Sequence, residues 1–94
     1  MNDEEMIQVL SELANKNRLA IYRLLIKRSE GLTVGEIGKK LDMPLSTLNF
    51  HLSGLKNAGL IIQDKKSRSV YCFAQLDILN KVLEKLNSEC CSDS

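Results

Sequence analysis

The sequence has few of the residues that mark secreted, membrane or disulfide-rich proteins. It contains no tryptophan, one proline, one histidine, and only 4% aromatic residues, so the core must consist mainly of leucine, isoleucine and valine. The three cysteines, Cys72, Cys90 and Cys91, do not suggest a disulfide framework. No run of about 18 apolar residues is present, and the acidic start is unlike a signal peptide. We therefore expect a cytoplasmic chain without a membrane partner.

The charges are unevenly distributed along a chain whose formal net charge is only +1. Residues 31–75 carry six basic and three acidic side chains, whereas residues 76–94 carry two basic and four acidic ones. A basic segment within a nearly neutral protein is expected where one face meets phosphate groups.

Apolar periodicity and capping residues predict five helices and two strands in a single domain, residues 1–94. Thr33 and Glu36 have capping-box spacing, Pro44 suits a helix start, and Gly31 and Gly59 suit helix ends. The expected helices are about Asp3–Leu13, Lys16–Arg28, Val34–Leu41, Leu45–Ala58 and Leu76–Glu89, and the expected strands are Leu60–Gln63 and Ser69–Phe73.

Two short helices joined by Asp42-Met43-Pro44 have the spacing of a helix-turn-helix. The second helix has Leu48, Leu52 and Leu55 on one face, with His51 beside them. Its other face has small, polar side chains that suit contact with base edges in a major groove. The candidate DNA-contacting residues of this helix are Ser46, Thr47, Asn49, Phe50, His51, Ser53 and Lys56.

The two strands enclose a polar hairpin tip, Asp64-Lys65-Lys66-Ser67-Arg68. Immediately after a helix-turn-helix, such a hairpin is typical of a wing whose basic side chains reach phosphates or the minor groove. We therefore predict a mainly α, winged helix-turn-helix fold in which Lys65, Lys66 and Arg68 contact double-stranded DNA.

The first and last helices both carry apolar stripes that exceed the needs of a small core. The stripes predict a homodimer formed through these two helices. The residues expected to be buried between subunits are Met6, Val9, Leu79, Val82 and Leu86.

Five segments, in order and spacing, resemble the ArsR/SmtB family of metal-responsive transcriptional repressors. They are residues 13–21 (LANKNRLAI), 31–37 (GLTVGEI), 46–52 (STLNFHL), 58–61 (AGLI) and 67–71 (SRSVY). The resemblance covers about residues 5–91 and implies a dimeric repressor that leaves its operator DNA when a metal or metalloid binds.

The family's effector sites differ, and this sequence matches only one of them. Residues 33–38 lack the thiols of one site, and Asp77 lacks the histidine partner of another. The terminal pair Cys90-Cys91 resembles the arsenic-sensing branch, without the third cysteine that often follows. The expected effector is trivalent arsenic, as arsenite or methylarsenite, or else antimonite, and no resident cofactor is required.

Three alternatives stay open at this point. The cysteine pair is also suited to a redox switch, and a DNA-binding regulator without any effector would have an idle pair. A thiol enzyme such as an arsenate reductase has little support, because the chain lacks a C-x-x-C motif, a phosphate-binding loop and an acid-base pair near the thiols.

Overall fold

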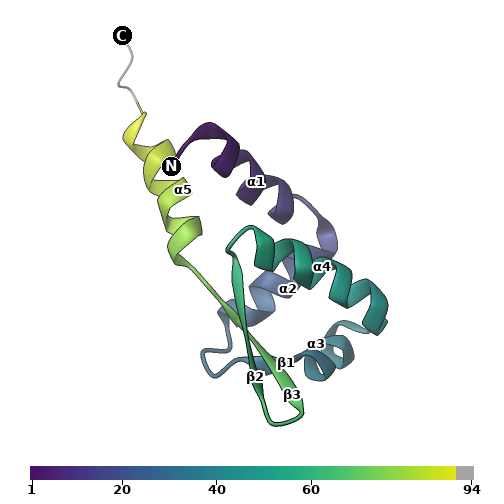
Figure 1. Ribbon diagram of the computed structural model, residues 1–94. Coiled ribbons are helices and arrows are strands. Elements are labelled where there is room, and N and C mark those ends of the chain that lie inside the picture. The colour runs from purple at the N-terminus through teal and green to yellow at the C-terminus, as the bar shows by residue number, and fades with distance from the viewer. Residues whose placement is uncertain (91–94) are drawn as a thin grey trace.

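The computed structural model describes residues 1–90, which form five helices and a small three-stranded sheet (Figure 1). The winged helix-turn-helix predicted from the sequence is confirmed. In chain order the elements are α1 (Asp3–Leu13), α2 (Lys16–Ile26), β1 (Leu32–Thr33), α3 (Val34–Leu41), α4 (Leu45–Asn57), β2 (Ile61–Lys66), β3 (Ser69–Ala74) and α5 (Asp77–Ser88).

Side-chain caps explain where the first three helices begin. Asn2 with Glu5 and Thr33 with Glu36 form reciprocal capping boxes at α1 and α3, and the Asn15 side chain caps α2. The hydrogen bonds from the backbone and hydroxyl of Thr33 hold the pKa of Glu36 below its usual range. The observed starts of α1, α2 and α3 agree with those expected from the sequence.

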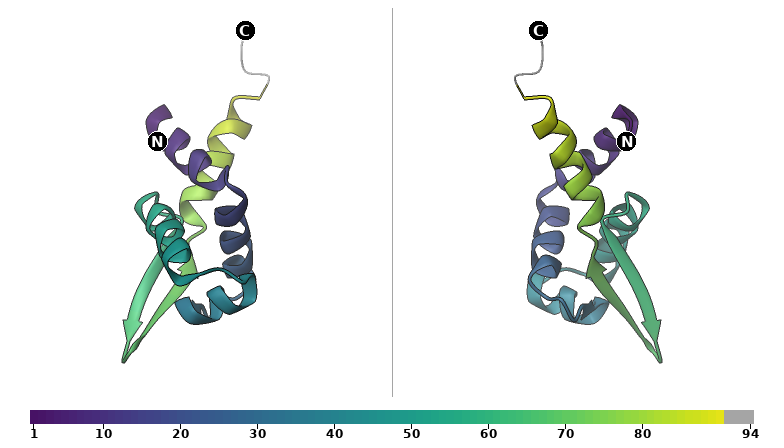
Figure 2. Two further views of the ribbon diagram at one scale, coloured as in Figure 1. Left: turned by 90° about the vertical axis from the view of Figure 1, so that its right-hand side faces the viewer. Right: turned by 90° about the vertical axis from the view of Figure 1, so that its left-hand side faces the viewer.

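The sheet is antiparallel, with strand order β1-β3-β2. Sequence periodicity did not predict β1, which is only two residues long and pairs Leu32 with Cys72. The predicted hairpin tip was too long, because β2 continues through its polar residues to Lys66. Only Ser67 and Arg68 remain as the connection, and Ser67 has a φ of 57°. The wing is therefore a paired ribbon that extends well away from the helices (Figure 2).

The core lies where α2, α4 and the sheet meet, and it extends between α1 and α5. Three residues predicted to lie between subunits, Met6, Val9 and Val82, are already buried inside the single chain. That part of the dimer prediction was wrong, because the inner faces of α1 and α5 pack on each other and on the common core. The apolar side chains that both helices leave exposed are Ile7, Leu10, Leu83 and Leu86.

Gly31 does not end α2, which stops at Ile26; it forms the turn into β1. Its φ is +80°, and a Cβ atom there would collide with the Phe73 ring. Gly59 has the same φ, but a Cβ atom there would meet nothing within 4 Å. A comparison of substitutions at these two glycines therefore separates the cost of backbone strain from the cost of steric overlap.

We expect Gly31→Ala to lower the free energy of unfolding by about 2–4 kcal/mol, since strain and overpacking add. Gly59→Ala should cost only about 1–2 kcal/mol, which is the strain alone. Urea denaturation of both variants measures the difference. Equal losses would show that the Phe73 ring moves aside without penalty.

Candidate nucleic-acid interface and effector site

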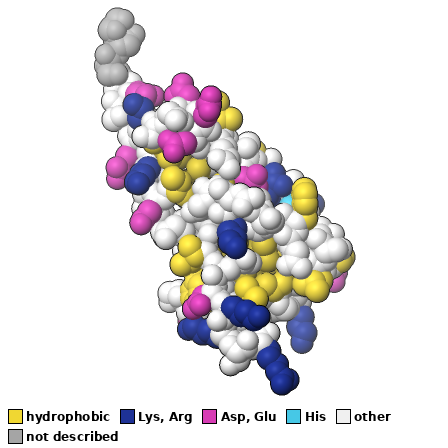
Figure 3. All heavy atoms as spheres, in the orientation of Figure 1, with side chains coloured by type: hydrophobic (Ala, Val, Ile, Leu, Met, Phe, Trp, Pro, Cys, Tyr) yellow, Lys and Arg dark blue, Asp and Glu magenta, His cyan; other side chains and the backbone are white. Residues whose placement is uncertain are grey.

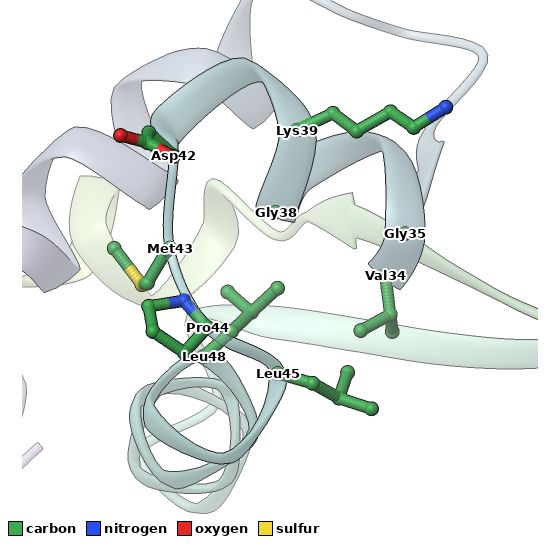
Figure 4. Close-up of a pocket in the computed structure, with 9 residues that line it drawn as sticks. All are labelled: Val34, Gly35, Gly38, Lys39, Asp42, Met43, Pro44, Leu45 and Leu48. Atoms are coloured by element: carbon green, nitrogen blue, oxygen red, sulfur yellow. The ribbon is translucent and has the colours of Figure 1, made fainter.

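The first three residues of α4, Leu45 to Thr47, are exposed. Asp42, in a left-handed conformation with φ 52°, turns the chain after α3, and Pro44 precedes α4 without a side-chain cap. The first amides of α4 therefore remain available to an acceptor such as a phosphate oxygen. An open hollow of about 780 Å³ lies between α3 and α4. Figure 4 shows the residues that line it, with Leu45 at its edge. Gly38 lines this hollow, where a Cβ atom would lie 3.2 Å from the Met43 carbonyl oxygen.

The outer face of α4 carries most of the residues predicted to contact DNA. Its inner face packs Leu48, Leu52 and Leu55 into the core. Phe50 is the most exposed of the large apolar side chains, at 71%. The predicted residues that are exposed on this helix are Ser46, Thr47, Asn49, Phe50, Ser53 and Lys56.

The structure corrects the placement of His51, which was predicted to contact DNA. Only 7% of this residue is exposed, and its ring nitrogens face Asn17 and Arg18 of α2. The neighbouring Phe50 ring meets the imidazole edge to face, at 5.5 Å between centroids. His51 therefore belongs to the buried face of α4, as its position beside Leu48 and Leu52 in the sequence indicated.

Lys65, Lys66 and Arg68 are all exposed on the wing. The Nζ atom of Lys66 lies 3.9 Å from Asp64 Oδ2, an exposed ion pair that contributes little to stability. A second hollow, of about 400 Å³, lies between α3, the start of α4 and the wing. Asn49 and Arg68, which are far apart in the sequence, both line it. One concave surface thus combines a side chain suited to bases with one suited to phosphates.

The two ends of the molecule differ in charge, as Figure 3 shows. Acidic side chains gather over the end formed by α1 and α5, and basic ones dominate at the opposite end around the wing. α1 has three acidic residues in its first turn and no basic residue in its last. α4 lies between these two ends, with α1 on one side and α3 on the other (Figure 1).

The cysteines lie in different environments. Cys90 is exposed just beyond the C-terminal end of α5, whereas Cys91 lies outside the described residues. Cys72 is fully buried in β3, where burial raises the pKa of its thiol and the Gln63 amide donates to its Sγ. A buried, protonated thiol is a poor metal ligand. Within residues 1–90, no three His, Cys, Asp or Glu side chains cluster as a metal site.

Comparisons with known proteins identify the family. Residues 13–64 match the family model of a helix-turn-helix domain. An uncharacterized helix-turn-helix transcriptional regulator of Bacillus subtilis, YceK, is 32% identical over 87% of this chain and 82% of its own. The crystal structure of an ArsR family transcriptional regulator superimposes with a TM-score of 0.81 at 25% identity, covering 95% of this chain and 89% of the other. The chain belongs to the ArsR family.

Two other relatives of this chain differ in their named roles. Reduced HlyU of Vibrio cholerae has a TM-score of 0.74 at 26% identity, covering 95% of this chain and 93% of its own; its sequence carries the name transcriptional activator. A putative arsenical resistance operon repressor of Halobacterium salinarum is 38% identical over 69% of this chain and 50% of its own. These relatives are named as transcriptional regulators or repressors. This protein, which shares their helix-turn-helix fold, is accordingly a DNA-binding regulator.

No helix within residues 1–90 of this ArsR-family protein has both the length and the apolar character needed to cross a bilayer.

The wing position predicts how Arg68 acts. We expect Arg68→Ala to weaken binding to every DNA sequence alike and to lower the slope of log affinity against log salt by about one unit, because one phosphate contact is lost. Fluorescence anisotropy at several salt concentrations measures the slope. Lys81→Ala, an exposed lysine on α5 at the acidic end, is the matched control and should leave it unchanged. An unaltered slope for Arg68→Ala would remove this residue from the interface.

Asn49 should instead affect sequence preference. A side-chain amide can pair with adenine in the major groove, and each such pair contributes about 1–3 kcal/mol of discrimination. We expect Asn49→Ala to relax the preference at one position of each half-site in selection from a random-sequence library. A variant that weakens all sequences equally would show that Asn49 contacts the backbone only.

Proposed function

We propose that this protein is a homodimeric repressor that binds double-stranded operator DNA and releases it when trivalent arsenic binds Cys90 and Cys91. The observation that carries the proposal is the contrast between the cysteines. Cys90 is exposed beyond the end of α5, whereas Cys72 is buried in the sheet. The effector therefore has access to the thiol of Cys90 and not to that of Cys72 in the wing.

The chemistry of two adjacent thiols favours a methylated trivalent arsenical. Methylarsenite has two exchangeable hydroxyl groups, and two thiols replace them with two As–S bonds and the release of two water molecules. Arsenite has three such groups, so two local thiols leave one hydroxyl on arsenic. Thiolates are soft ligands and suit arsenic and antimony better than hard cations. The name of the Halobacterium relative, an arsenical resistance repressor, supports the same effector class.

The homodimer is proposed from the exposed faces of α1 and α5. Ile7, Leu10, Leu83 and Leu86 are exposed although they are large and apolar, and they lie on two helices that pack side by side. Burying them in a second copy would stabilise both chains. Two copies would also present two α4 helices, which must stand about 34–36 Å apart to occupy successive major grooves.

The decisive experiment titrates the reduced protein on DNA from the region upstream of its own gene. Methylarsenite, arsenite, antimonite and hydrogen peroxide are added separately, and fluorescence anisotropy follows release. We expect methylarsenite to release DNA at least as well as arsenite. Any release caused by peroxide should be reversed by dithiothreitol. Release by peroxide alone would identify a redox sensor, since an exposed Cys90 is open to oxidation. No release by any of the four would leave a regulator without these effectors.

The direction of regulation needs a separate measurement, because the relative HlyU is named as an activator. In vitro transcription from the same DNA distinguishes the two. A repressor lowers transcript yield until the arsenical is added, whereas an activator raises it.

A further inference from the structure

On the buried side of α4, the helix predicted to enter the major groove and called the recognition helix below, side chains from three helices meet. They are Glu12 of α1, Arg18 of α2 and His51 of α4. Arg18 holds the end of α1. Its Nε atom donates to the Glu12 carbonyl oxygen at 2.6 Å, and its Nη2 atom donates to the Ser11 carbonyl oxygen at 3.4 Å. The last carbonyls of a helix lack partners within the helix, so a guanidinium group there fixes the position of the α1 end.

The same guanidinium group reaches α4. Its Nη1 atom lies 3.4 Å from His51 Nδ1. Arginine has no acceptor, so Arg18 must donate and Nδ1 must be unprotonated. The other ring nitrogen, Nε2, lies 3.4 Å from the Nδ2 atom of Asn17. His51 is thus held between two residues of α2.

Glu12 brings α1 directly onto the recognition helix. Its carboxylate oxygen Oε1 occupies the space where a Cβ atom of Gly54 would be, three residues after His51. This oxygen lies 3.1 Å from Arg18 Nε, but the single proton of Nε already points to the Glu12 carbonyl oxygen. Within residues 1–90 no hydrogen-bond donor reaches Oε1. The Oε1 atom is buried, although the Glu12 side chain as a whole is 23% exposed, and its ion pair is with Arg18, so its position depends on that arginine.

We propose that Arg18 and His51 are positioning residues for DNA binding, which set the orientation of α4 relative to the end of α1. One face of α4 is exposed for DNA, and the opposite face holds His51 and Gly54 against α2 and α1. α1 also packs against α5. A displacement of the α1–α5 pair therefore reaches the recognition helix through a rigid, planar guanidinium group. The proposal rests on DNA binding only and does not require the arsenic effector.

A matched pair of His51 variants tests the role of Nδ1. Asparagine places its oxygen near the position of Nδ1, whereas glutamine places its oxygen near that of Nε2. The probe is a DNA duplex selected from a random library by the wild-type protein. We expect His51→Asn to keep most of the affinity, and His51→Gln and Arg18→Gln each to lose about tenfold. The double variant Arg18→Gln/His51→Gln should bind DNA no more weakly than the weaker of the two single variants, because both substitutions remove the same interaction.

The controls separate positioning from stability and from direct DNA contact. Arg23→Gln removes an exposed arginine from the same helix and should leave the affinity unchanged. Thermal unfolding, recorded for each variant, shows that binding is measured on folded protein. Arg18→Lys keeps the charge but cannot span α1 and His51 together, so it should lose affinity while the salt slope stays the same.

Three results would overturn the proposal. The first is that the losses of Arg18→Gln and His51→Gln multiply in the double variant, which means that the residues act independently. The second is equal affinity for His51→Asn and His51→Gln. The third is a salt slope lowered by about one unit in Arg18→Gln together with normal affinity in Arg18→Lys, which would make Arg18 a phosphate contact.

Discussion

Leu83→Asp is expected to convert the protein to a monomer and to lower its affinity for a two-half-site operator by about 100-fold or more. Leu83 is 47% exposed on α5 in the single chain, so aspartate there does not enter the core. In the proposed dimer, however, it would place an unpaired carboxylate in an apolar interface, which is strongly unfavourable. Each monomer would then bind one half-site, without the high effective concentration that the second subunit provides.

Ile26→Asp is the matched control for this variant. Ile26 is a large apolar residue on α2 with 42% exposure, outside the α1–α5 face. Sedimentation equilibrium at micromolar concentration should give a dimer for the wild type and for Ile26→Asp, and a monomer near 10.6 kDa for Leu83→Asp. A dimer of Leu83→Asp with normal DNA affinity would show that the subunits associate through another surface.

Cys90→Ser is expected to abolish release from DNA by methylarsenite while leaving DNA affinity in the absence of arsenic unchanged. Cys90 lies just beyond the end of α5, so an arsenic atom that bridges its thiol and that of Cys91 constrains the chain at the end of this helix. α5 contributes to the proposed interface, and a small rotation there changes the spacing of the two α4 helices. A coupling of about 1–3 kcal/mol corresponds to a 5- to 150-fold loss of affinity. Without the thiol of Cys90, arsenic has no bridge to form.

Cys72→Ser is the control for the cysteine prediction. Its hydroxyl group can accept from the Gln63 amide, which donates to the Cys72 Sγ atom in the wild type. This variant should respond to methylarsenite normally, since a thiol buried in β3 does not meet the ligand. If Cys72→Ser abolished the response as fully as Cys90→Ser, a three-thiol site would replace the two-thiol one. Anisotropy titrations of both variants on the same DNA decide between these outcomes.

The sequence predicted most of the fold because its elements begin at residues with strong local preferences. Thr33 with Glu36 and Pro44 mark the starts of α3 and α4, and both starts are where they were expected. The end of α2 was placed too late, because Gly31 suits a helix end but serves a turn packed under Phe73. β1 was missed because a two-residue strand has no periodicity and depends on its pairing with β3.

The errors in the predicted dimer interface and DNA contacts have one physical origin. The spacing of residues on one helix does not reveal which other element packs against them. Val9 and Val82 belong to apolar stripes, but the chain itself buries them. His51 belongs to the helix that was predicted to face DNA, yet Arg18 and Asn17, more than thirty residues earlier, hold it inside. Such contacts depend on tertiary packing, which the spacing of residues along one helix cannot reveal.

The opposite charges at the two ends of the molecule affect how the protein finds DNA. A net charge of +1 gives almost no overall attraction to a polyanion, but the separated charges form an electric dipole. The field of DNA exerts a torque on this dipole, so that the wing approaches first and the α1–α5 end points away. Productive encounters then become more frequent without strong, sequence-independent adhesion. The preference for one approach direction should weaken as salt shortens the screening length.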